Sequence, residues 1–318
     1  MKILLTGATG FLGKKLLSLL STEDVITISR SRQKSDICKP RTSYQLDINE
    51  KADYTEALMG VDVVIHCAGR AHIMNDDVGD PLLAFRRVNT YGTLNLAQQA
   101  ADSGVKRFIF ISSIKVNGES TALGVPFRPD DTHIPEDSYG LSKYEAEIGL
   151  RKIANKTGME IVIIRPPLVY GPNVKANFTS MMKWLNKGVS LPFGAIYNKR
   201  SFVALDNVVS FIIHCIDHPK AANEVFLISD GEDVSTTQLL QKVAKALGKK
   251  PSLIPLPVSW MTFAARLVGK GDVATRLFGS LQVDSSKARD LLGWHPVITM
   301  DTQLKKTADA YLENEKTL

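Results

Sequence analysis

The sequence predicts an α/β protein whose parallel sheet is covered by helices on both faces. Short apolar runs alternate with longer helical patterns along the 318-residue chain. Moreover, a run such as RFIFIS at 107–112 is apolar almost throughout, which is typical of a strand buried on both faces. The expected strands are 2–6, 25–29, 63–66, 108–112 and 161–165, and the expected helices are 11–20, 81–103 and 138–155.

The turn after the first expected strand is rich in glycine. Residues 6–13 read TGATGFLG, with glycines three residues apart, and they open the first expected helix. Glycines allow a tight turn that approaches a pyrophosphate closely, and the free amides of the helix start favour its negative charge. The motif therefore predicts a Rossmann domain, a doubly wound parallel sheet that binds a dinucleotide. Its expected cofactor contacts are Gly7, Gly10, Phe11, Leu12 and Gly13.

The end of the second expected strand distinguishes between the nicotinamide cofactors. An acidic residue there binds the ribose hydroxyls of NAD, whereas an arginine accommodates the extra phosphate of NADP. Here the strand ends Ser29-Arg30-Ser31-Arg32, without an acid. Because a guanidinium suits a phosphate, we expect Arg30 to bind the cofactor and NADP(H) to be preferred, with NAD as the alternative. The other interpretation is that both arginines are solvated loop charges.

Two residues of DSYGLSKYEAE (137–147) suit proton transfer. Tyr139 and Lys143 are four residues apart and so share one face of the expected helix. A cation about 4 Å away lowers the pKa of a phenol by up to about three units, which suits general acid–base catalysis near neutral pH. Ser113 ends the preceding strand, where α/β sheets place ligands, and can bond the reacting oxygen. The alternatives are a chance Tyr-x-x-x-Lys pattern and serines that only form a turn.

The composition argues against several other classes of protein. The formal charge is +6, yet no Lys/Arg run is interleaved with aromatic residues, so we expect no nucleic-acid partner. That charge indicates either a mildly basic surface or a basic cleft for an anionic substrate. Three scattered cysteines and six scattered histidines predict neither disulfides nor a metal site, and favour a cytoplasmic location. No apolar run is long enough to span a bilayer, so no stable membrane insertion is expected.

The pattern changes after Pro166, where a stretch containing Gly and Pro begins, and a smaller, discontinuous C-terminal domain is expected. The expected boundaries are 1–170 plus about 201–228 for the dinucleotide-binding domain, and 171–200 plus 229–318 for the substrate domain. Within the latter, VSWMTFAARLVG (258–269) is apolar at helical spacing and is expected to be a core or lid helix, with a contact to a membrane surface as the alternative. The last six residues are expected to be a frayed tail.

In order and spacing, these motifs resemble those of the extended short-chain dehydrogenases/reductases, the NAD-dependent epimerase/dehydratase family. The resemblance spans essentially the whole chain and includes Asp47-Ile48, HCAGR (66–70) and Asn89. It implies that Asp47 and Ile48 flank the adenine and that Asn89 supports Lys143. The further cofactor contacts that it implies are Cys67, Ala68 and Gly69 near the ribose, with Tyr139, Lys143 and Pro166.

A second group of motifs resembles the substrate half of this family. These motifs are RPPLVYGP (165–172), KANF (175–178) and KRSFVALDN (199–207). The resemblance implies that Asn177 and Arg200 hold the diphosphate of a UDP-sugar, and that Ser113 and Lys115 also contact the substrate. Asn177 as a plain helix cap is the alternative, and Arg276 is the candidate for a second diphosphate-binding arginine. A homodimer that pairs the two longest helices is implied as well.

The residue after the active-site hydroxyl limits the reaction. The 4,6-dehydratases of the family resemble one another in an Asp-Glu pair at this point, whereas Ser113 is followed by Ile114-Lys115, so dehydration is disfavoured. Oxidation to an acid would need a nucleophilic cysteine, which this constellation lacks. Reversible hydride transfer at a carbinol or ketone therefore remains.

Three functions stay open on this basis. SSIKVNGE (112–119) and residues 277–294 resemble a subgroup of bacterial surface-polysaccharide (O-antigen) synthesis. This favours an NADPH-dependent 4-reductase of a UDP-4-keto-6-deoxy-N-acetylhexosamine. The first alternative is a UDP-glucose or UDP-N-acetylglucosamine 4-epimerase, although Leu168 replaces an Asn that is common in epimerases. The remote alternative is a non-enzymatic NADP-sensing regulator.

Overall fold

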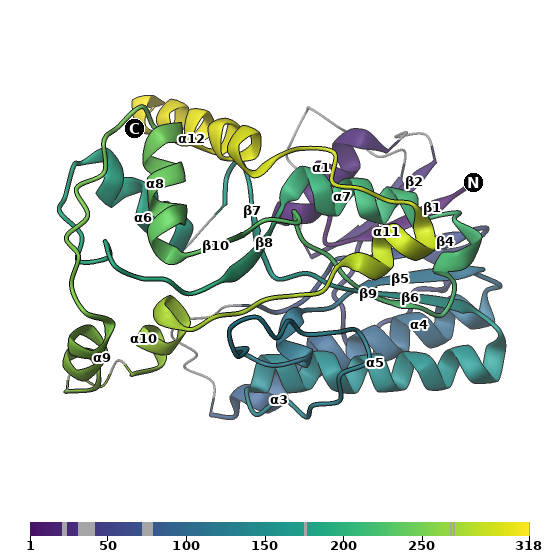
Figure 1. The fold of residues 1–318 in the computed structure, drawn as a ribbon. Coiled ribbons are helices and arrows are strands. Elements are labelled where there is room, and N and C mark those ends of the chain that lie inside the picture. Colours follow the sequence, from purple (N-terminus) through teal and green to yellow (C-terminus); the bar gives the residue numbers. More distant parts are fainter. Residues whose placement is uncertain are drawn as a thin grey trace.

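The computed structural model describes residues 1–20, 24–30, 42–71, 79–174, 177–267, 269 and 271–317. In this part of the chain, parallel strands form one large sheet in the order β3-β2-β1-β4-β5-β6-β9 (Figure 1). The strands are β1 (Ile3–Thr6), β2 (Val25–Ser29), β3 (Thr42–Gln45), β4 (Val63–His66), β5 (Arg107–Ile111), β6 (Glu160–Arg165) and β9 (Val225–Leu227). The Rossmann prediction is confirmed, and the expected strands are found to within a residue or two; β3 was not expected.

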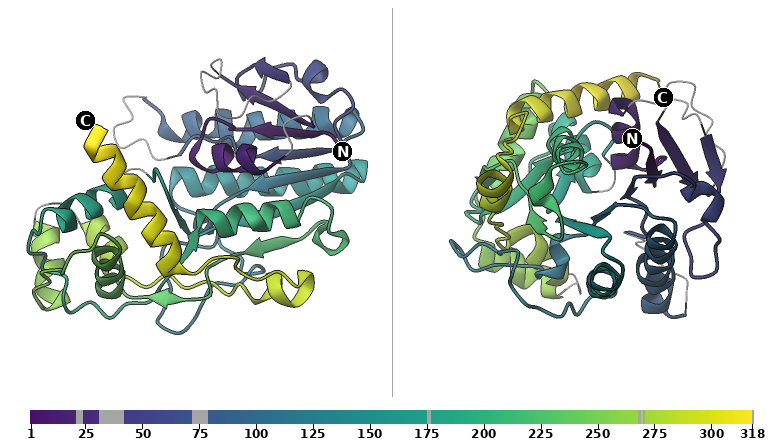
Figure 2. Two further views of the ribbon diagram at one scale, coloured as in Figure 1. Left: turned by 90° about the horizontal axis from the view of Figure 1, so that it is seen from above. Right: turned by 90° about the vertical axis from the view of Figure 1, so that its right-hand side faces the viewer.

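Alternate side chains of each strand enter two separate cores. Ile3 and Leu5 of β1 pack on one face of the sheet with α1, α7 and α11, whereas Leu4 packs on the other face with α2, α4 and α5. Figure 2 shows these helices on both sides of the sheet. The helices are α1 (Phe11–Leu19), α2 (Thr55–Leu58), α4 (Thr93–Asp102), α5 (Ser138–Thr157), α7 (Leu205–His214) and α11 (Ser286–Leu292).

The order of the strands reverses between β1 and β4, which are hydrogen-bonded neighbours. Sheets of this kind bind ligands in the crevice beyond the carboxyl ends of the strands at such a point. The register pairs Thr6 with His66, so the glycine turn and the loop after β4 leave the sheet side by side. The fold thereby brings these two predicted cofactor segments to one place.

The long helix expected over 81–103 is interrupted. It consists of α3 (Pro81–Arg86), a π-helical segment (Arg87–Gly92) and α4. At its end, Gly92 allows this turn to approach the loop after β3 closely, because a Cβ on Gly92 would lie 2.9 Å from backbone atoms of Ile48 and Asn49. π-Helical turns are common at functional sites, and this one carries the buried Asn89.

A second body of structure follows the large sheet. Its sheet has the order β10-β8-β7, and its own hydrophobic core includes Tyr170, Phe178 and Leu240 (Figure 1). The elements are β7 (Leu168–Tyr170), β8 (Arg200–Ala204), β10 (Asp233–Val234), α6 (Asn177–Asn186), α8 (Thr236–Ala246) and α12 (Met300–Thr317). The division into two discontinuous domains remains a proposal. Within the expected substrate segment 229–318, α11 packs on the core of the large sheet instead.

The structure corrects two expectations for the C-terminal part. The helix α9 (Val258–Leu267) forms as expected but contains no buried residue, so of its expected roles that of a core helix is excluded. The expected frayed tail is helical over 313–317, because α12 continues to Thr317, whereas Leu318 lies outside the described residues. Within the described ranges, no helix combines the length and apolar character needed to cross a membrane.

Candidate active site

The glycine turn lies against the loop that follows β4. Gly7 has a φ of +71°, a left-handed conformation that favours glycine, and a Cβ there would lie 2.7 Å from the Ala68 nitrogen. A Cβ on Gly13 would lie 2.1 Å from the carbonyl oxygen of Gly7. Gly10 precedes α1 and is exposed, and no capping side chain accepts a bond from the first amides of the helix. This narrow cradle at a helix start fits the pyrophosphate of a dinucleotide.

Gly13→Ala is expected to weaken cofactor binding at least about tenfold, because the new methyl group must displace the Gly7 carbonyl on which the turn is built. Titration calorimetry with NAD(H) measures the effect. The matched control is Gly79→Ala, since nothing lies within 4 Å of a Cβ at that position. An unchanged Kd in Gly13→Ala would contradict the assignment of this turn to the cofactor.

A buried histidine connects the glycine turn to the helical layer. His66 is bonded through Nδ1 to Thr6 Oγ1 (2.7 Å) and through Nε2 to Thr93 Oγ1 (2.9 Å), and Thr6 Oγ1 also accepts a bond from the Ala68 nitrogen (3.2 Å). Burial lowers the pKa of His66 to about 3, so the ring is neutral at physiological pH. The sequence analysis missed this role, because a single histidine at the end of a strand carries no pattern.

Asn89 links the loop after β4 to the helix that carries Tyr139 and Lys143. Its Oδ1 accepts a bond from the Arg70 nitrogen (2.8 Å), and its Nδ2 donates to the Arg70 oxygen (3.0 Å) and to Ser142 Oγ (3.0 Å). A Cβ on Gly69 would lie 3.3 Å from both Asn89 Oδ1 and Lys143 Nζ. The implied support of Lys143 by Asn89 therefore has a structural route through Ser142, the neighbouring residue.

The other predicted cofactor residues lie after β2, after β3 and at the end of β6. Ile48 is buried beside the π-helical turn, and the carbonyl of Asp47 accepts a bond from the Tyr54 hydroxyl (3.0 Å). Arg30 follows β2 and is exposed, whereas Arg32 lies outside the described residues. The Pro166 carbonyl accepts a bond from the Ile114 nitrogen (3.0 Å), which holds the end of β6 against the turn of Ser113. Their contacts with a cofactor remain predictions.

Ser113, Tyr139 and Lys143 come together beyond the carboxyl end of β5. Tyr139 and Lys143 lie on α5, and the Ser113 hydroxyl is hydrogen-bonded to the phenol of Tyr139. Lys143 Nζ donates to the Ile111 carbonyl (2.9 Å) and lies 4.5 Å from the centre of the Phe110 ring. A phenol, a hydroxyl and an ammonium thus meet next to the predicted cofactor loop, and this set of groups can move a proton at one oxygen atom.

The expected effect of Lys143 on the phenol is not seen in the protein alone. Burial raises the pKa of Tyr139 to about 12, and the hydrogen bond from Ser113 opposes this rise only in part. Lys143 directs its ammonium to the Ile111 carbonyl, and burial lowers the pKa of Lys143 to about 8. The desolvation of both groups, which is not visible in the spacing of Tyr139 and Lys143, therefore outweighs the charge of the lysine.

Lys143→Met is expected to stabilise the fold by about 2 kcal/mol at pH 7. Lowering the pKa of Lys143 from 10.5 to about 8 costs about 3 kcal/mol of folding free energy, and the lost bond to Ile111 returns about 1. Between these two pKa values the unfolded state binds more protons, so the stability of the wild type rises with pH and the difference from the variant shrinks. Urea unfolding at pH 7 and 10 measures both effects; a variant less stable than wild type at pH 7 would contradict the account.

A buried ion pair anchors α5 beneath these residues, one helical turn after Lys143. Glu147 accepts two bonds from Arg165, at 3.0 Å from Nε and 2.6 Å from Nη2, and a third from Ser112 Oγ at 2.5 Å. Arg165 also donates to Asn117 Oδ1 (2.9 Å). Glu147 and Arg165 are only 2% and 5% exposed. Because Glu147 lies on α5, Arg165 ends β6 and Ser112 follows β5, these buried bonds join the helix of Tyr139 to the ends of both strands. Sequence reasoning missed it, although Glu147 continues the four-residue spacing of Tyr139 and Lys143.

The residues predicted for the substrate lie on separate elements. Arg200 is the first residue of β8, and its guanidinium donates to the backbone carbonyls of Arg276 (2.8 Å) and Gly279 (3.0 Å). Burial lowers the pKa of Arg200. Lys115 is paired with Glu119 (2.6 Å) and Asp137 (3.1 Å). Asn177 begins α6, but its side chain lies outside the described part of the structure.

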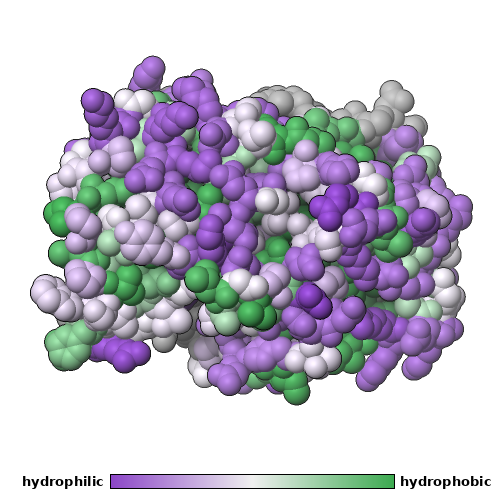
Figure 3. All heavy atoms as spheres, in the orientation of Figure 1, coloured by the Kyte–Doolittle hydropathy of each residue, from purple (hydrophilic) through white to green (hydrophobic). Residues whose placement is uncertain are grey.

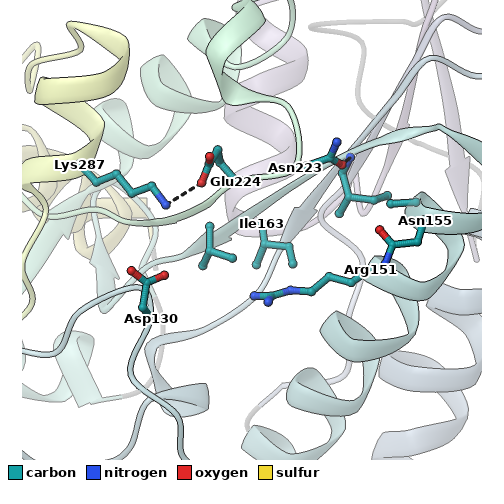
Figure 4. Close-up of a pocket in the computed structure, with 10 residues that line it drawn as sticks. Asp130, Arg151, Asn155, Ile163, Asn223, Glu224 and Lys287 are labelled. Carbon is teal, nitrogen blue, oxygen red and sulfur yellow. Dashed lines mark hydrogen bonds and ion pairs between the residues drawn. The ribbon is translucent and has the colours of Figure 1, made fainter.

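A pocket elsewhere on the protein is distinct from this site. It has a volume of about 250 Å³ and includes Ile161 and Ile163 of β6 and an ion pair between Lys287 and Glu224 (2.6 Å; Figure 4). Asn223 and Glu224 precede β9, and Ile161 lies near the start of β6. The pocket therefore opens toward the amino ends of the parallel strands, whereas the candidate active site lies beyond their carboxyl ends.

Comparisons with known proteins agree with this geometry. The family described as the NAD dependent epimerase/dehydratase family matches residues 3–229. A UDP-glucose 4-epimerase of Vibrio cholerae is 51% identical over 313 residues, which cover 98% of this chain and 95% of that protein. An N-acetyl-α-D-glucosaminyl-diphospho-ditrans,octacis-undecaprenol 4-epimerase of Escherichia coli O157:H7 is 32% identical over 81% of this chain and 77% of its own length.

A solved structure shows the same fold at lower identity. The UDP-glucuronic acid 4-epimerase of Bacillus cereus, in complex with NAD, is 23% identical with a TM-score of 0.79, and the match covers 98% of this chain and 99% of that one. The strand order, the glycine cradle and the matches in sequence all lead to one conclusion. The chain belongs to the NAD-dependent epimerase/dehydratase family of short-chain enzymes.

Proposed function

We propose that the protein is a UDP-hexose 4-epimerase. The observation that carries this proposal is the 51% identity to a UDP-glucose 4-epimerase over nearly the whole of both chains. It favours the alternative expectation over the 4-ketoreductase, for which the comparisons give no support. The meeting of Ser113, Tyr139 and Lys143 supplies the groups that a 4-epimerase needs, because inversion requires one proton to leave and return at a single oxygen atom.

The side chains of this site have distinct tasks in the proposed reaction. Tyr139 takes the proton of the hydroxyl at carbon 4 and later returns it, while Ser113 binds the same oxygen and is already bonded to the phenol. When bound, the oxidised nicotinamide supplies a hydride acceptor and a positive charge. A phenol beside that charge and the ammonium of Lys143 has its pKa lowered from about 12, toward the range where it can act as a base.

NAD is the cofactor that the proposal favours. An epimerase returns its hydride within each turnover and needs no external supply, and the B. cereus 4-epimerase of the same fold binds NAD. Arg30, exposed after β2, still predicts an affinity for the 2′-phosphate of NADP. Mass spectrometry of the nucleotides released from denatured protein distinguishes the two; NADP as the only retained cofactor would favour the reductase.

The direct test is the incubation of purified protein with UDP-glucose or UDP-N-acetylglucosamine without added cofactor. The proposal predicts the corresponding galacto epimer, detected by proton NMR of the anomeric signal. The competing reaction, reduction of a UDP-4-keto sugar, would instead consume one NADPH per product. If neither UDP-sugar is converted while NADPH is consumed with the keto sugar, the epimerase proposal is wrong.

A second substrate class belongs in the same assay. The E. coli relative is named for an N-acetylglucosaminyl diphosphate attached to a long polyprenol. A UDP-sugar and such a lipid share the diphosphate next to the sugar, so Arg200 suits both. The exposed apolar face of α9, Trp260, Phe263 and Leu267, favours testing the lipid-linked form.

A further inference from the structure

The helix α9 presents an apolar face to solvent. Trp260, Phe263 and Leu267 are spaced by three and four residues and so lie on one side of the helix. They are 71%, 65% and 72% exposed, although a surface helix normally turns such a stripe toward the core. A cluster of large exposed apolar side chains marks a surface that binds something.

Neighbouring segments extend this apolar surface. Ile254, in the segment before α9, is 47% exposed, and its backbone nitrogen donates to the carbonyl of Leu191. Val189, two residues before Leu191, is 44% exposed. In Figure 1, α9 and α10 (Gly271–Phe278) lie at the end of the molecule farthest from the large sheet. Figure 3 shows green and pale residues in this corner, mixed with purple ones.

The same part of the chain is strongly basic. Residues 171–200 contain five Lys and Arg and no acid, and residues 239–283 contain seven Lys and Arg and one Asp. These two segments therefore carry a formal charge of +11, whereas the rest of the chain carries −5. Five of the described cations of these two segments are exposed, namely Lys183, Lys187, Lys249, Lys250 and Arg266.

We propose that α9 docks this end of the protein on the surface of an anionic lipid bilayer. Aromatic and aliphatic side chains on one helix face, surrounded by Lys and Arg, are the features of an interfacial helix, whose cations are attracted by acidic headgroups. A second copy of the chain fits less well, because it would bring two lobes of like charge together. α9 contacts α10, and the carbonyl of Arg276 in the last turn of α10 accepts a bond from the Arg200 guanidinium. Docking of α9 would therefore hold Arg200, the candidate diphosphate-binding residue, on the membrane side of the protein.

Flotation of the full-length protein with vesicles tests this proposal. Binding is expected to vesicles that contain phosphatidylglycerol and not to vesicles of phosphatidylcholine alone, and to weaken as salt is added. Trp260→Ser combined with Phe263→Ser should lower the affinity for vesicles at least about tenfold, because both apolar side chains that would enter the bilayer surface are removed. The matched control combines Met59→Ser with Leu123→Ser, whose side chains are 71% and 66% exposed on other segments.

Two further measurements decide the outcome. Activity toward a UDP-sugar in solution should be unchanged in the α9 variant, since these side chains lie outside the site, and this also shows that the variant is folded. A wild type that does not float with anionic vesicles at low salt overturns the proposal, as does equal binding of the α9 variant. Sedimentation that shows a wild-type oligomer dissociated by Trp260→Ser and Phe263→Ser would instead assign the face to a second copy.

Discussion

Tyr139→Phe is expected to lower kcat by at least about 100-fold, with little change in the free energy of unfolding. The variant removes one phenol oxygen and its bond to Ser113, while Lys143 keeps its contacts with Ile111 and Phe110. Loss of a positioned proton donor and acceptor costs about two to four powers of ten in rate. Loss of a single neutral hydrogen bond costs about 1 kcal/mol of stability.

The matched control for this variant lies on the same helix. Tyr144→Phe removes an equivalent oxygen from α5, five residues further along, and is expected to leave kcat unchanged. Initial rates of both variants at saturating UDP-sugar, together with urea unfolding, separate loss of chemistry from loss of structure. A Tyr139→Phe enzyme with wild-type kcat would show that another group moves the proton.

Glu147→Ala is expected to lower the free energy of unfolding by about 3–5 kcal/mol. The change leaves the Arg165 guanidinium buried without its carboxylate and removes the acceptor of Ser112 Oγ. It also lowers the pKa of Lys143 further, because the charge of Glu147 favours the ammonium. Since the pair joins α5 to the ends of β5 and β6, we expect kcat to fall even at temperatures where the variant is folded.

The chain offers a close control two residues away. Glu145 also forms a two-pronged ion pair, with Arg86, but the two side chains are 27% and 31% exposed. Exposed pairs contribute about 1 kcal/mol or less, so Glu145→Ala should cost little. In addition, Glu147→Leu combined with Arg165→Met should recover much of the lost stability, because no unpaired charge stays buried. Equal destabilisation by Glu145→Ala and Glu147→Ala would contradict the role of burial.

The fold was largely predictable because its signals are local. The strands of the large sheet are short apolar runs, and the glycine turn follows one of them directly, so that strand, turn and helix are read from adjacent residues. The approach of Ser113 to Tyr139 was also predictable, since the carboxyl ends of parallel strands and the starts of the helices that follow them lie at one edge of the sheet. Each of these predictions depends on order along the chain and on one topological rule.

The remaining features depend on contacts between distant segments. Glu147 resembles a solvated charge in the sequence, and only the packing of α5 on β6 turns it toward Arg165. The pKa of Tyr139 follows from burial, which spacing along a helix does not reveal. Likewise, the apolar pattern of α9 predicted a core or lid helix, because a sequence pattern shows that a face is apolar but not what covers it.

The most direct test of the proposed function follows the hydrogen at carbon 4. UDP-glucose labelled with deuterium at that carbon is incubated with the purified enzyme without added cofactor, and the product is analysed by NMR and mass spectrometry. The account predicts UDP-galactose that keeps the deuterium at carbon 4, because the hydride returns within one active site. Epimer that has lost the label to solvent, or no epimer until NADPH is supplied, would contradict it.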